Sequence, residues 1–376
     1  MKKILVVNDN LHIGGIQKSL QNFLKEENAE YDITLVLFNP EIGEQTLSGV
    51  KLLKVSSTYK MLGCTKKELW KNHKCLFFYK GILRYVAKAF NRRVAMKILG
   101  LFQKKITGYD VAISYSHPKS YRDLSGGSAE FVLDKVKADM KICYVHCDYT
   151  RSGTLSEYNN ALYSQFDRIA CCSKSVREVF LREVPQCSSK AYVMRNFYDI
   201  EIDRLSKTNP YIYDDAYINL VIVARLSEEK GIDRMIKAIH LSERKDVRCY
   251  IIGEGPQEVE LRRLIQGYNL EQQVFLMGAD TNPYKYFHHA DYLCVPSYHE
   301  AAPMVFDEAK ILGLPVITTN TTSAEEMIAT DFGIVCENND EAIAQVVSTL
   351  KKGMFQEQKV VDNSLQIEQF NALINK

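Results

Sequence analysis

Residues 297–320 read SYHEAAPMVFDEAKILGLPVITTN and carry two glutamates, Glu300 and Glu308, on either side of a proline. The apolar run DYLCVPS leads into this stretch and the run PVITT follows its helical pattern, which predicts strand, loop, helix and strand. Pro303 suits the first helical turn, where its missing amide proton is not needed, and Gly313 suits the helix end. The stretch therefore predicts one βαβ unit of a parallel sheet.

The same alternation of apolar runs and helical patterns extends along most of the chain. The runs are KILVV, ITLVLF, VAISY, KICYVH, RIACC and AYVM, and after about Asn209 they are NLVIVA, CYII, VFLM, DYLCVP, PVITT and GIVC. Continuous apolar strands separated by helices indicate parallel sheets covered on both faces. The polar segment 199–217 lacks clear periodicity and is predicted as a linker, so the fold class is α/β with two doubly wound domains.

We expect an N-terminal domain over residues 1–205, a second domain over 206–357, and a C-terminal helix within 358–376 that packs back toward the first domain. Open α/β sheets bind ligands beyond the carboxyl ends of their strands. With two such domains, the predicted site is the cleft between the facing strand ends.

Composition is that of a soluble globular protein, with 46% apolar and 25% charged residues among 376. The start, MKKILVVNDN, is too short in apolar residues for a signal-peptide core, and no run of about 18 apolar residues predicts a membrane span. Ten cysteines without disulfide-like spacing are expected to stay reduced. The run CYVHC at 143–147 lacks a second ligand pair, which disfavours a metal site.

Several loops after predicted strands carry residues suited to an anionic ligand. Gly14 and Gly15 precede a helix and permit close backbone approach, although an ordinary turn fits them equally well. The three-glycine dinucleotide fingerprint is absent there, which disfavours an NAD enzyme. Arg225 and Lys230 lie in one loop, where a planar fork and a point charge suit a diphosphate. Gly253, in IIGEGP, again permits close approach.

The helix of the opening stretch offers both an anion site and carboxylates. The amides of Met304 and Val305 lie at the positive end of the helix without intrahelical acceptors. Glu308 falls on or beside the apolar face, where a carboxylate needs partners, and ionised oxygens suit hydroxyl-rich ligands. A core-edge carboxylate is the plainer alternative for Glu308, and a solvated loop acid is the alternative for Glu300. Asp307, with a lysine three residues later, is predicted to be a surface acid.

These motifs together resemble a known enzyme family. ARLSEEKG, IIGEGP, VFLMG and HEAAPMVFDEAKILGLPVITT follow one another in the order and spacing of retaining glycosyltransferases of family four, which have the two-domain GT-B fold. GGIQKSLQNFL resembles the N-terminal loop of that family, and CCSKSVREVF and VMRNFYD resemble its segments before the linker. The resemblance covers most of the chain and is strongest from Asn219 to Val335. Ala301 and Ala302 stand where members often have glycine.

The resemblance implies roles for matching positions. Arg225 and Lys230 would neutralise the diphosphate of a nucleotide sugar, Glu308 would bind the ribose, and Glu300 would bind the sugar hydroxyls. His146, at the end of KICYVH, matches a histidine that faces the transferred sugar, although a buried strand-end imidazole is an equal alternative. The expected catalytic residues are Glu300, His146, Arg225 and Lys230. The expected donor-binding residues are Gly14, Gly15, Arg225, Lys230, Gly253, Glu300, Ala302, Pro303, Met304, Val305 and Glu308.

The implied activity is transfer of a hexose-type sugar from a nucleotide diphosphate donor, a UDP-sugar, to a glycan or lipid-linked glycan. The resemblance implies retention of anomeric configuration and a role in cell-surface polysaccharide synthesis, such as a capsule. No Asp-any-Asp triplet occurs, so no metal and no cofactor are expected. The alternatives are a sugar-nucleotide epimerase of the same fold and a non-catalytic nucleotide-sugar-binding protein.

One strongly basic segment spans residues 60–105. It holds thirteen Lys and Arg residues against the single acid Glu68, a formal charge of +12, with aromatic and aliphatic residues at helical spacings. Such a segment suits an anionic membrane surface, and a solvated helical face is the plainer alternative. No base-reading motif accompanies it, so nucleic acid is not expected as a partner. The predicted location is cytoplasmic, peripheral on the inner face of the plasma membrane.

Overall fold

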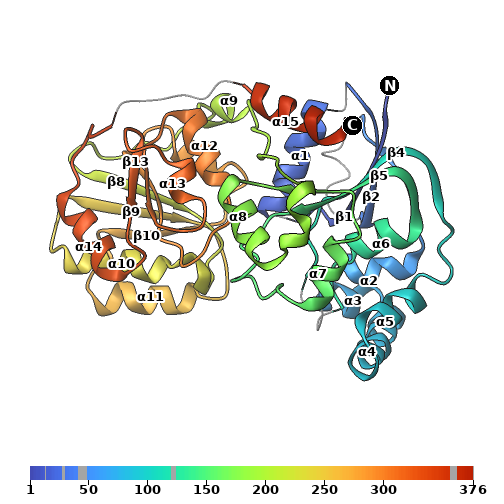
Figure 1. Ribbon diagram of the computed structural model, residues 1–376. Coiled ribbons are helices and arrows are strands. Elements are labelled where there is room, and N and C mark those ends of the chain that lie inside the picture. Colours follow the sequence, from blue (N-terminus) through green and yellow to red (C-terminus); the bar gives the residue numbers. More distant parts are fainter. Residues whose placement is uncertain (13, 28–29, 41–48, 120–123, 356–361, 376) are drawn as a thin grey trace. The chain divides into compact units, whose positions relative to one another are not determined.

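The computed structural model describes residues 1–12, 14–27, 30–40, 49–119, 124–355 and 362–375. The chain forms two compact units, the first comprising Met1–Phe197 with Asn363–Lys376 and the second comprising Tyr198–Asp362 (Figure 1). Each unit is built on a parallel β-sheet with helices packed on it, so the predicted α/β class with two Rossmann-like halves is confirmed. Among the residues described, no helix is both long and apolar enough to cross a membrane.

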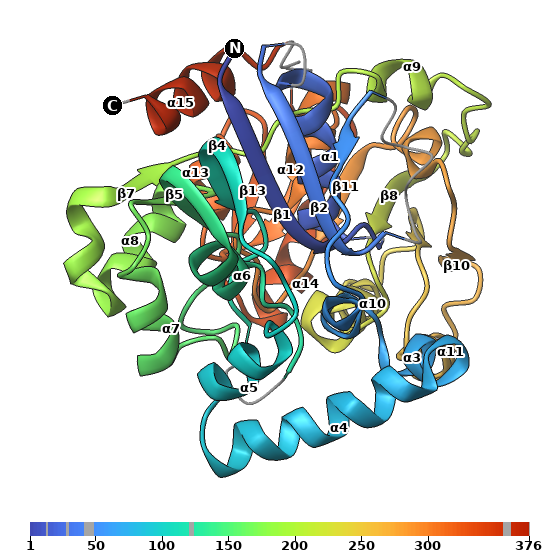
Figure 2. The same cartoon turned by 90° about the vertical axis from the view of Figure 1, so that its right-hand side faces the viewer.

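The sheet of the first unit runs in the order β3-β2-β1-β4-β5-β6-β7, and every pairing is parallel. Figure 2 shows β1, β2, β4 and β5 from this sheet. The residues of β1 from Ile4 to Val7 are fully buried, as expected for a strand covered on both faces. The strands are β1 (Lys3–Asn10), β2 (Asp32–Asn39), β3 (Lys51–Leu52), β4 (Ile106–Ser114), β5 (Val136–Val145), β6 (Arg168–Cys171) and β7 (Ala191–Val193).

Polar side chains fix the starts of several helices in this unit. Ser156 and Ser173 each accept a hydrogen bond from the backbone amide three residues later, and Thr65 forms a reciprocal capping box with Glu68. The helices are α1 (Gly15–Glu27), α2 (Lys60–Gly63), α3 (Lys66–Asn72), α4 (Lys74–Ala89), α5 (Arg92–Leu99), α6 (Ser128–Lys135), α7 (Glu157–Tyr163), α8 (Lys174–Glu183) and α15 (Ser364–Ile374).

Helix α15, although last in the chain, is part of the core of the first unit. The fully buried ring of Phe370 lies 4.9 Å from the ring centroid of Phe23 and 5.6 Å from that of Tyr31. Leu373 and Ile374 are buried in the same cluster. The core of the first unit therefore needs residues from both ends of the chain.

The sheet of the second unit runs in the order β10-β9-β8-β11-β12-β13, again with parallel pairings. The chain order reverses between β8 and β11, and ligands of such sheets bind beyond the carboxyl ends of the strands at this point. The strands are β8 (Ile218–Val223), β9 (Val247–Ile252), β10 (Val274–Gly278), β11 (Tyr292–Val295), β12 (Val316–Thr319) and β13 (Gly333–Cys336). The helices are α9 (Ile202–Ser206), α10 (Ile232–Leu241), α11 (Glu258–Gly267), α12 (Met304–Leu312), α13 (Ala324–Met327) and α14 (Asp340–Thr349).

The segment 199–217, predicted as a linker, is instead packed into the second unit. Ile202 on α9 is buried against Tyr284 and Ile311. Tyr213 is also buried, and its hydroxyl donates to a backbone oxygen of the same unit at 2.6 Å. The boundary therefore falls before Tyr198 rather than after residue 205, because apolar side chains in this polar-looking segment anchor it to the second core.

Candidate functional site

The stretch that carries the two glutamates folds as predicted. Strand β11 ends at Val295, helix α12 begins at Met304, and Pro303 immediately precedes the helix with φ −68°. Gly313 ends the helix in the left-handed region at φ 70°, and its amide donates to the oxygen of Ala309. The first amides of α12, including that of Met304, lie at the positive end of the helix and suit an anion. Their contact with a phosphate stays a prediction.

Lys230 and Glu300 form an ion pair, which the sequence did not predict. Lys230 Nζ lies 2.7 Å from Glu300 Oε1, and the hydroxyl of Ser297 donates to the same oxygen at 2.9 Å. The lysine side chain is 28% exposed and the glutamate side chain 13%. The two residues follow β8 and β11, which are neighbours at the point where the strand order reverses. The structure therefore places one predicted phosphate ligand and one predicted sugar ligand in contact.

The loop after β8 presents a mixed set of charges. Arg225 is exposed, and Ser227 donates to Glu229 at 2.6 Å. Burial raises the pKa of Glu229, but the hydrogen bond from Ser227 and the charges of Lys230 and Arg225 outweigh it, and the pKa falls below its ordinary value. Glu229 is therefore ionised at neutral pH, and it offsets part of the positive charge of the loop.

Gly253 is required by the packing of the protein on itself. It has φ 150°, and a Cβ added there would lie 1.9 Å from the carbonyl oxygen of Ala224. A Cβ at Gly255 would lie 2.3 Å from the oxygen of Leu226. The loops after β8 and β9 thus touch backbone to backbone, which accounts for both glycines. A role of Gly253 in donor binding stays a prediction.

Helix α12 is buried on most of its circumference. Glu308 is 6% exposed, in agreement with its predicted place beside the apolar face. Asp307 is also 6% exposed, so its prediction as a surface acid is wrong; Lys310 lies 3.8 Å from its carboxylate. The reason is that side chains on both sides of the helix, such as Phe306 and Ile311, pack into separate apolar clusters. Of the other predicted donor ligands, Ala302 and Val305 are partly buried against the core of the second unit.

In the first unit, the predicted residues lie after β1 and β5. Gly14 and Gly15 are exposed, and α1 begins at Gly15. His146 follows β5, with its ring stacked on Tyr144 at a centroid distance of 5.1 Å. Burial and the charge of His117 lower the pKa of His146 to about 3, against a backbone hydrogen bond that raises it. His146 is therefore neutral at physiological pH and offers hydrogen bonds rather than charge.

Sequence reasoning missed three polar residues that lie, like His146, at strand ends of the first unit. Asp9 is 2% exposed and lies 3.2 Å from Lys119 Nζ. Burial opposes charge on both His117 and Cys147, but the electrostatic attraction and the hydrogen bond between them raise the pKa of the imidazole and lower that of the thiol. The available signal was position, because Asp9, His117 and Cys147 all lie at or just after the carboxyl ends of strands, as His146 does.

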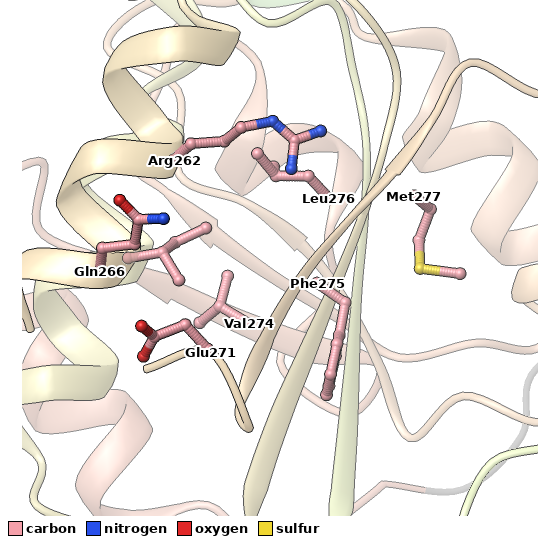
Figure 3. A pocket seen from close by; sticks show the side chains of 8 residues that line it. Arg262, Gln266, Glu271, Val274, Phe275, Leu276 and Met277 are labelled. Carbon is pink, nitrogen blue, oxygen red and sulfur yellow. The ribbon is translucent and has the colours of Figure 1, made fainter. Parts of the chain in front are cut away.

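A surface hollow in the second unit lies away from these residues. It has a volume of about 350 Å³ and lies between α11 and the edge strand β10 (Figure 3). Its lining residues are Arg262, Ile265, Gln266, Glu271, Val274, Phe275, Leu276 and Met277, none of which was predicted to bind the donor. Within the described parts of the chain, no group of three or more His, Cys, Asp or Glu residues is arranged to hold a metal ion.

Comparison with known proteins finds a family match within the second unit. Residues 210–364 match the family described as Glycosyl transferases group 1. The chain is 29% identical over 192 residues to N-acetylgalactosamine-N,N'-diacetylbacillosaminyl-diphospho-undecaprenol 4-alpha-N-acetylgalactosaminyltransferase of Campylobacter jejuni, a match that covers 50% of this chain and 52% of that protein. It is 32% identical over 145 residues, 34% of each protein, to the putative colanic acid biosynthesis glycosyltransferase WcaL of Escherichia coli. The chain thus spans about half the length of these curated relatives, or less.

Solved structures resemble the chain over nearly its whole length. A mutant of S. aureus TarM, in complex with Fondaparinux, alpha-GlcNAc-glycerol and UDP, has a TM-score of 0.69 at 14% identity, covering 100% of both chains. Anabaena Alr3699/HepE in complex with UDP-glucose has a TM-score of 0.66 at 16% identity, covering 99% of this chain and 100% of the other. At such identities the likeness shows the fold alone. Residues 210–364 therefore match the glycosyl transferases group 1 family within a chain of GT-B fold, and the resemblance to a glycosyltransferase family that the motifs indicated is confirmed.

Proposed function

We propose that the protein moves a hexose-type sugar from a nucleotide diphosphate donor, a UDP-sugar, to a glycan or lipid-linked glycan acceptor. The transfer retains the anomeric configuration and serves the synthesis of a cell-surface polysaccharide such as a capsule. Support comes from the group 1 domain at residues 210–364 and from relatives named for transfer to a diphospho-undecaprenol-linked sugar and for colanic acid biosynthesis. Two structures of the same fold were solved with UDP or UDP-glucose bound.

The observation that carries this proposal is the contact of Lys230 with Glu300 at the carboxyl ends of β8 and β11. A nucleotide sugar has a diphosphate between two hydroxyl-rich rings, so its site needs cations at the centre and carboxylates on either side. Arg225 and Lys230 supply the cations, and Glu300 and the buried Glu308 supply the carboxylates. Arg225 and Lys230 lie in the loop after β8, Glu300 lies in the loop after the neighbouring strand β11, and Glu308 lies on the helix α12 that follows.

The proposed reaction stabilises a leaving diphosphate without a metal ion or other cofactor. Arg225, Lys230 and the first amides of α12 oppose the negative charge that develops on the diphosphate, a task in which fixed dipoles and charges are effective. The donor displaces Lys230 from Glu300 or binds alongside the pair, and Glu300 then accepts hydrogen bonds from sugar hydroxyls. Retention is proposed from the family resemblance.

The proposal is tested by incubating the purified protein with UDP-, GDP- and ADP-sugars, each with and without a lipid-linked glycan, in buffer containing EDTA. Nucleoside diphosphate released from a UDP-sugar only when acceptor is present is the expected result. Nuclear magnetic resonance of the product then reports the anomeric configuration. Conversion of a UDP-sugar to its epimer without acceptor would instead support the epimerase. No release or conversion with any donor contradicts the proposal.

We also propose that the basic segment 60–105 contacts an anionic membrane surface, on the inner face of the plasma membrane. Helix α4 exposes Phe78, Ile82 and Tyr85, which are 61, 62 and 74% exposed and lie at helical spacing on one face. Large apolar residues exposed together among cations are the features of a membrane-surface helix. Leu83, on the opposite side of α4, is buried and fixes the helix to the first unit.

A further inference from the structure

Arg234 is a buried arginine that lies beside the candidate site without belonging to it. It is on α10, and its side chain is 1% exposed. Its Nε lies 2.7 Å from Asp340 Oδ1, and its Nη1 donates to Asn338 Oδ1 at 2.8 Å and to the oxygen of Pro296 at 3.2 Å. The guanidinium also lies over the ring of Tyr298, 4.4 Å from its centroid. A planar fork with partners in several directions is fixed in one orientation.

These contacts join three segments of the second unit that are distant in sequence. Arg234 comes from α10. Asp340 is the first residue of α14, and Asn338 lies two residues before it. Pro296 and Tyr298 come from the loop after β11. The side-chain amide of Asn338 donates to the oxygen of Tyr298 at 3.0 Å, which closes the arrangement on itself. The loop after β11 is therefore held by two side chains, Arg234 from α10 and Asn338 from the segment before α14, and Arg234 contacts both the loop and Asn338.

The same loop is tied to the loop that carries Lys230. The amide of Tyr298 donates to the oxygen of Glu229 at 2.9 Å. A Cβ added at Gly231 would lie 2.2 Å from the oxygen of Pro296, so the backbone before α10 is in direct contact with the backbone of the loop. Glu300 follows two residues after Tyr298. Its position relative to Lys230 thus depends on how residues 296–298 are held.

We propose that Arg234 is a positioning residue that holds the loop 296–300, so that Glu300 stays within hydrogen-bond distance of Lys230. The guanidinium touches neither member of the pair in the contacts described here, and it acts through the backbone of Pro296 and the ring of Tyr298. What the positioned pair does rests on the proposed function. The positioning itself does not, because it concerns contacts within the second unit alone.

The first test is hydrogen exchange of the peptide 296–303, followed by mass spectrometry, in Arg234→Lys and Arg234→Met variants. Arg234→Lys keeps the charge but cannot reach all partners of the arginine. It serves as the second variant should Arg234→Met fail to fold. The control is Arg244→Met. Arg244 donates to backbone oxygens at the end of α14, Val347 at 3.2 Å and Leu350 at 2.6 Å, and so resembles Arg234 without touching the loop.

We expect exchange of the Tyr298 amide to quicken by roughly tenfold or more in both Arg234 variants, since hydrogen bonds to a charged group are lost. The Arg244 variant should leave this peptide as in the wild type. Unchanged exchange of 296–303 in Arg234→Met, or an equal change in Arg244→Met, would overturn the proposal whatever the enzyme does.

The second test is turnover of the UDP-sugar in a double-mutant cycle with Glu300→Gln. If Arg234 acts through the loop, Arg234→Lys lowers kcat in the wild-type background and has little further effect when Glu300 is already replaced. Additive losses in the cycle would overturn the proposal. Faster exchange of the loop in a protein that turns over no nucleotide sugar would leave the positioning intact and refute the proposed function.

Discussion

Lys230 Nζ lies 2.7 Å from Glu300 Oε1, and the two residues come from loops that follow neighbouring strands of one sheet. Replacement of Lys230 by methionine keeps most of the length of the side chain and removes the charge that we propose faces the diphosphate. We expect kcat/KM for the donor to fall by about 10- to 100-fold, the usual effect of losing a charge-assisted contact. The matched control is Lys237→Met on α10, whose ammonium pairs with Asp233 at 2.9 Å. Equal activity of the Lys230→Met and Lys237→Met variants would contradict the assignment of Lys230 to the donor site.

Arg225 is exposed directly after β8 and is predicted to bind the diphosphate from solvent. We expect Arg225→Ala to weaken UDP binding by about tenfold or more, because a guanidinium–phosphate contact is lost. Isothermal titration with UDP at low salt measures this directly. Arg263→Ala, at a 73% exposed position of α11, should leave the affinity unchanged. A Kd of wild-type size for Arg225→Ala contradicts the assignment.

Gly253→Ala should destabilise the second unit even though alanine is small. The new Cβ would lie 1.9 Å from the oxygen of Ala224, at a φ of 150° that side chains rarely adopt. We expect a loss of about 2 kcal/mol or more and a lower Tm, from backbone strain of this kind. Gly267→Ala is the control, since a Cβ there meets no atom within 4 Å. Thermal unfolding followed by circular dichroism compares the two variants.

Glu27 makes the stability of the first unit depend on pH. Burial, together with the charges of Glu26 and Glu30, raises the pKa of Glu27 to about 7 from 4.5. The folded state therefore binds this proton more tightly than the unfolded state does. Stability is highest below pH 4.5 for this group and falls as pH rises toward 7, by at most about 3 kcal/mol.

Glu27→Gln should abolish that part of the pH dependence, because the amide is neutral throughout. We expect the variant to gain stability over the wild type as pH increases from 5 to 7.5, with no further gain above. Chemical denaturation at each pH measures the difference. Glu178→Gln, at an exposed position of α8, should follow the wild type at every pH. If the unfolding free energies of Glu27→Gln and the wild type changed in parallel with pH, the pKa of the Glu27 carboxyl would not be raised by burial.

The exposed face of α4 should govern membrane contact. We expect the wild type to co-sediment with vesicles containing phosphatidylglycerol at low salt, and the triple serine variant of Phe78, Ile82 and Tyr85 to bind at least tenfold more weakly, since each side chain loses apolar burial. A matched triple serine variant of exposed apolar residues in the second unit is the control, at Ile212, Leu241 and Val259. No binding of the wild type at low salt would end the membrane proposal.

The strand framework could be predicted from sequence because its signal is local. Every apolar run singled out became a strand, and among the strands of the described residues only the two-residue β3 (Lys51–Leu52) was missing from the prediction. Both of its residues are exposed, so β3 carries no hydrophobic pattern. The end of α12 at Gly313 was equally readable, because a left-handed C-cap favours glycine wherever it occurs.

The candidate residues within each loop could be predicted from the sequence, but the contacts between loops could not. Lys230 contacts Glu300 because β8 and β11 are neighbours in the sheet. These strands are more than 60 residues apart in the sequence, and no local pattern reveals that they pair. The buried state of Asp307 and the hydrogen bond of His117 with Cys147 depend in the same way on tertiary packing. Which polar residues are buried or in contact is thus decided by how the strands and helices pack, and the neighbouring residues in the sequence do not reveal it.

Helix α15 makes the second unit an insertion within the first. The chain leaves the first unit at Phe197 and returns to it only at Asn363. During synthesis, the ribosome must therefore produce the whole second unit before Phe370 can reach Phe23. The second unit can fold first on the nascent chain, while the core of the first unit stays incomplete until α15 has been synthesised. A chain truncated before α15 should accordingly leave the first unit prone to aggregation and the second able to fold.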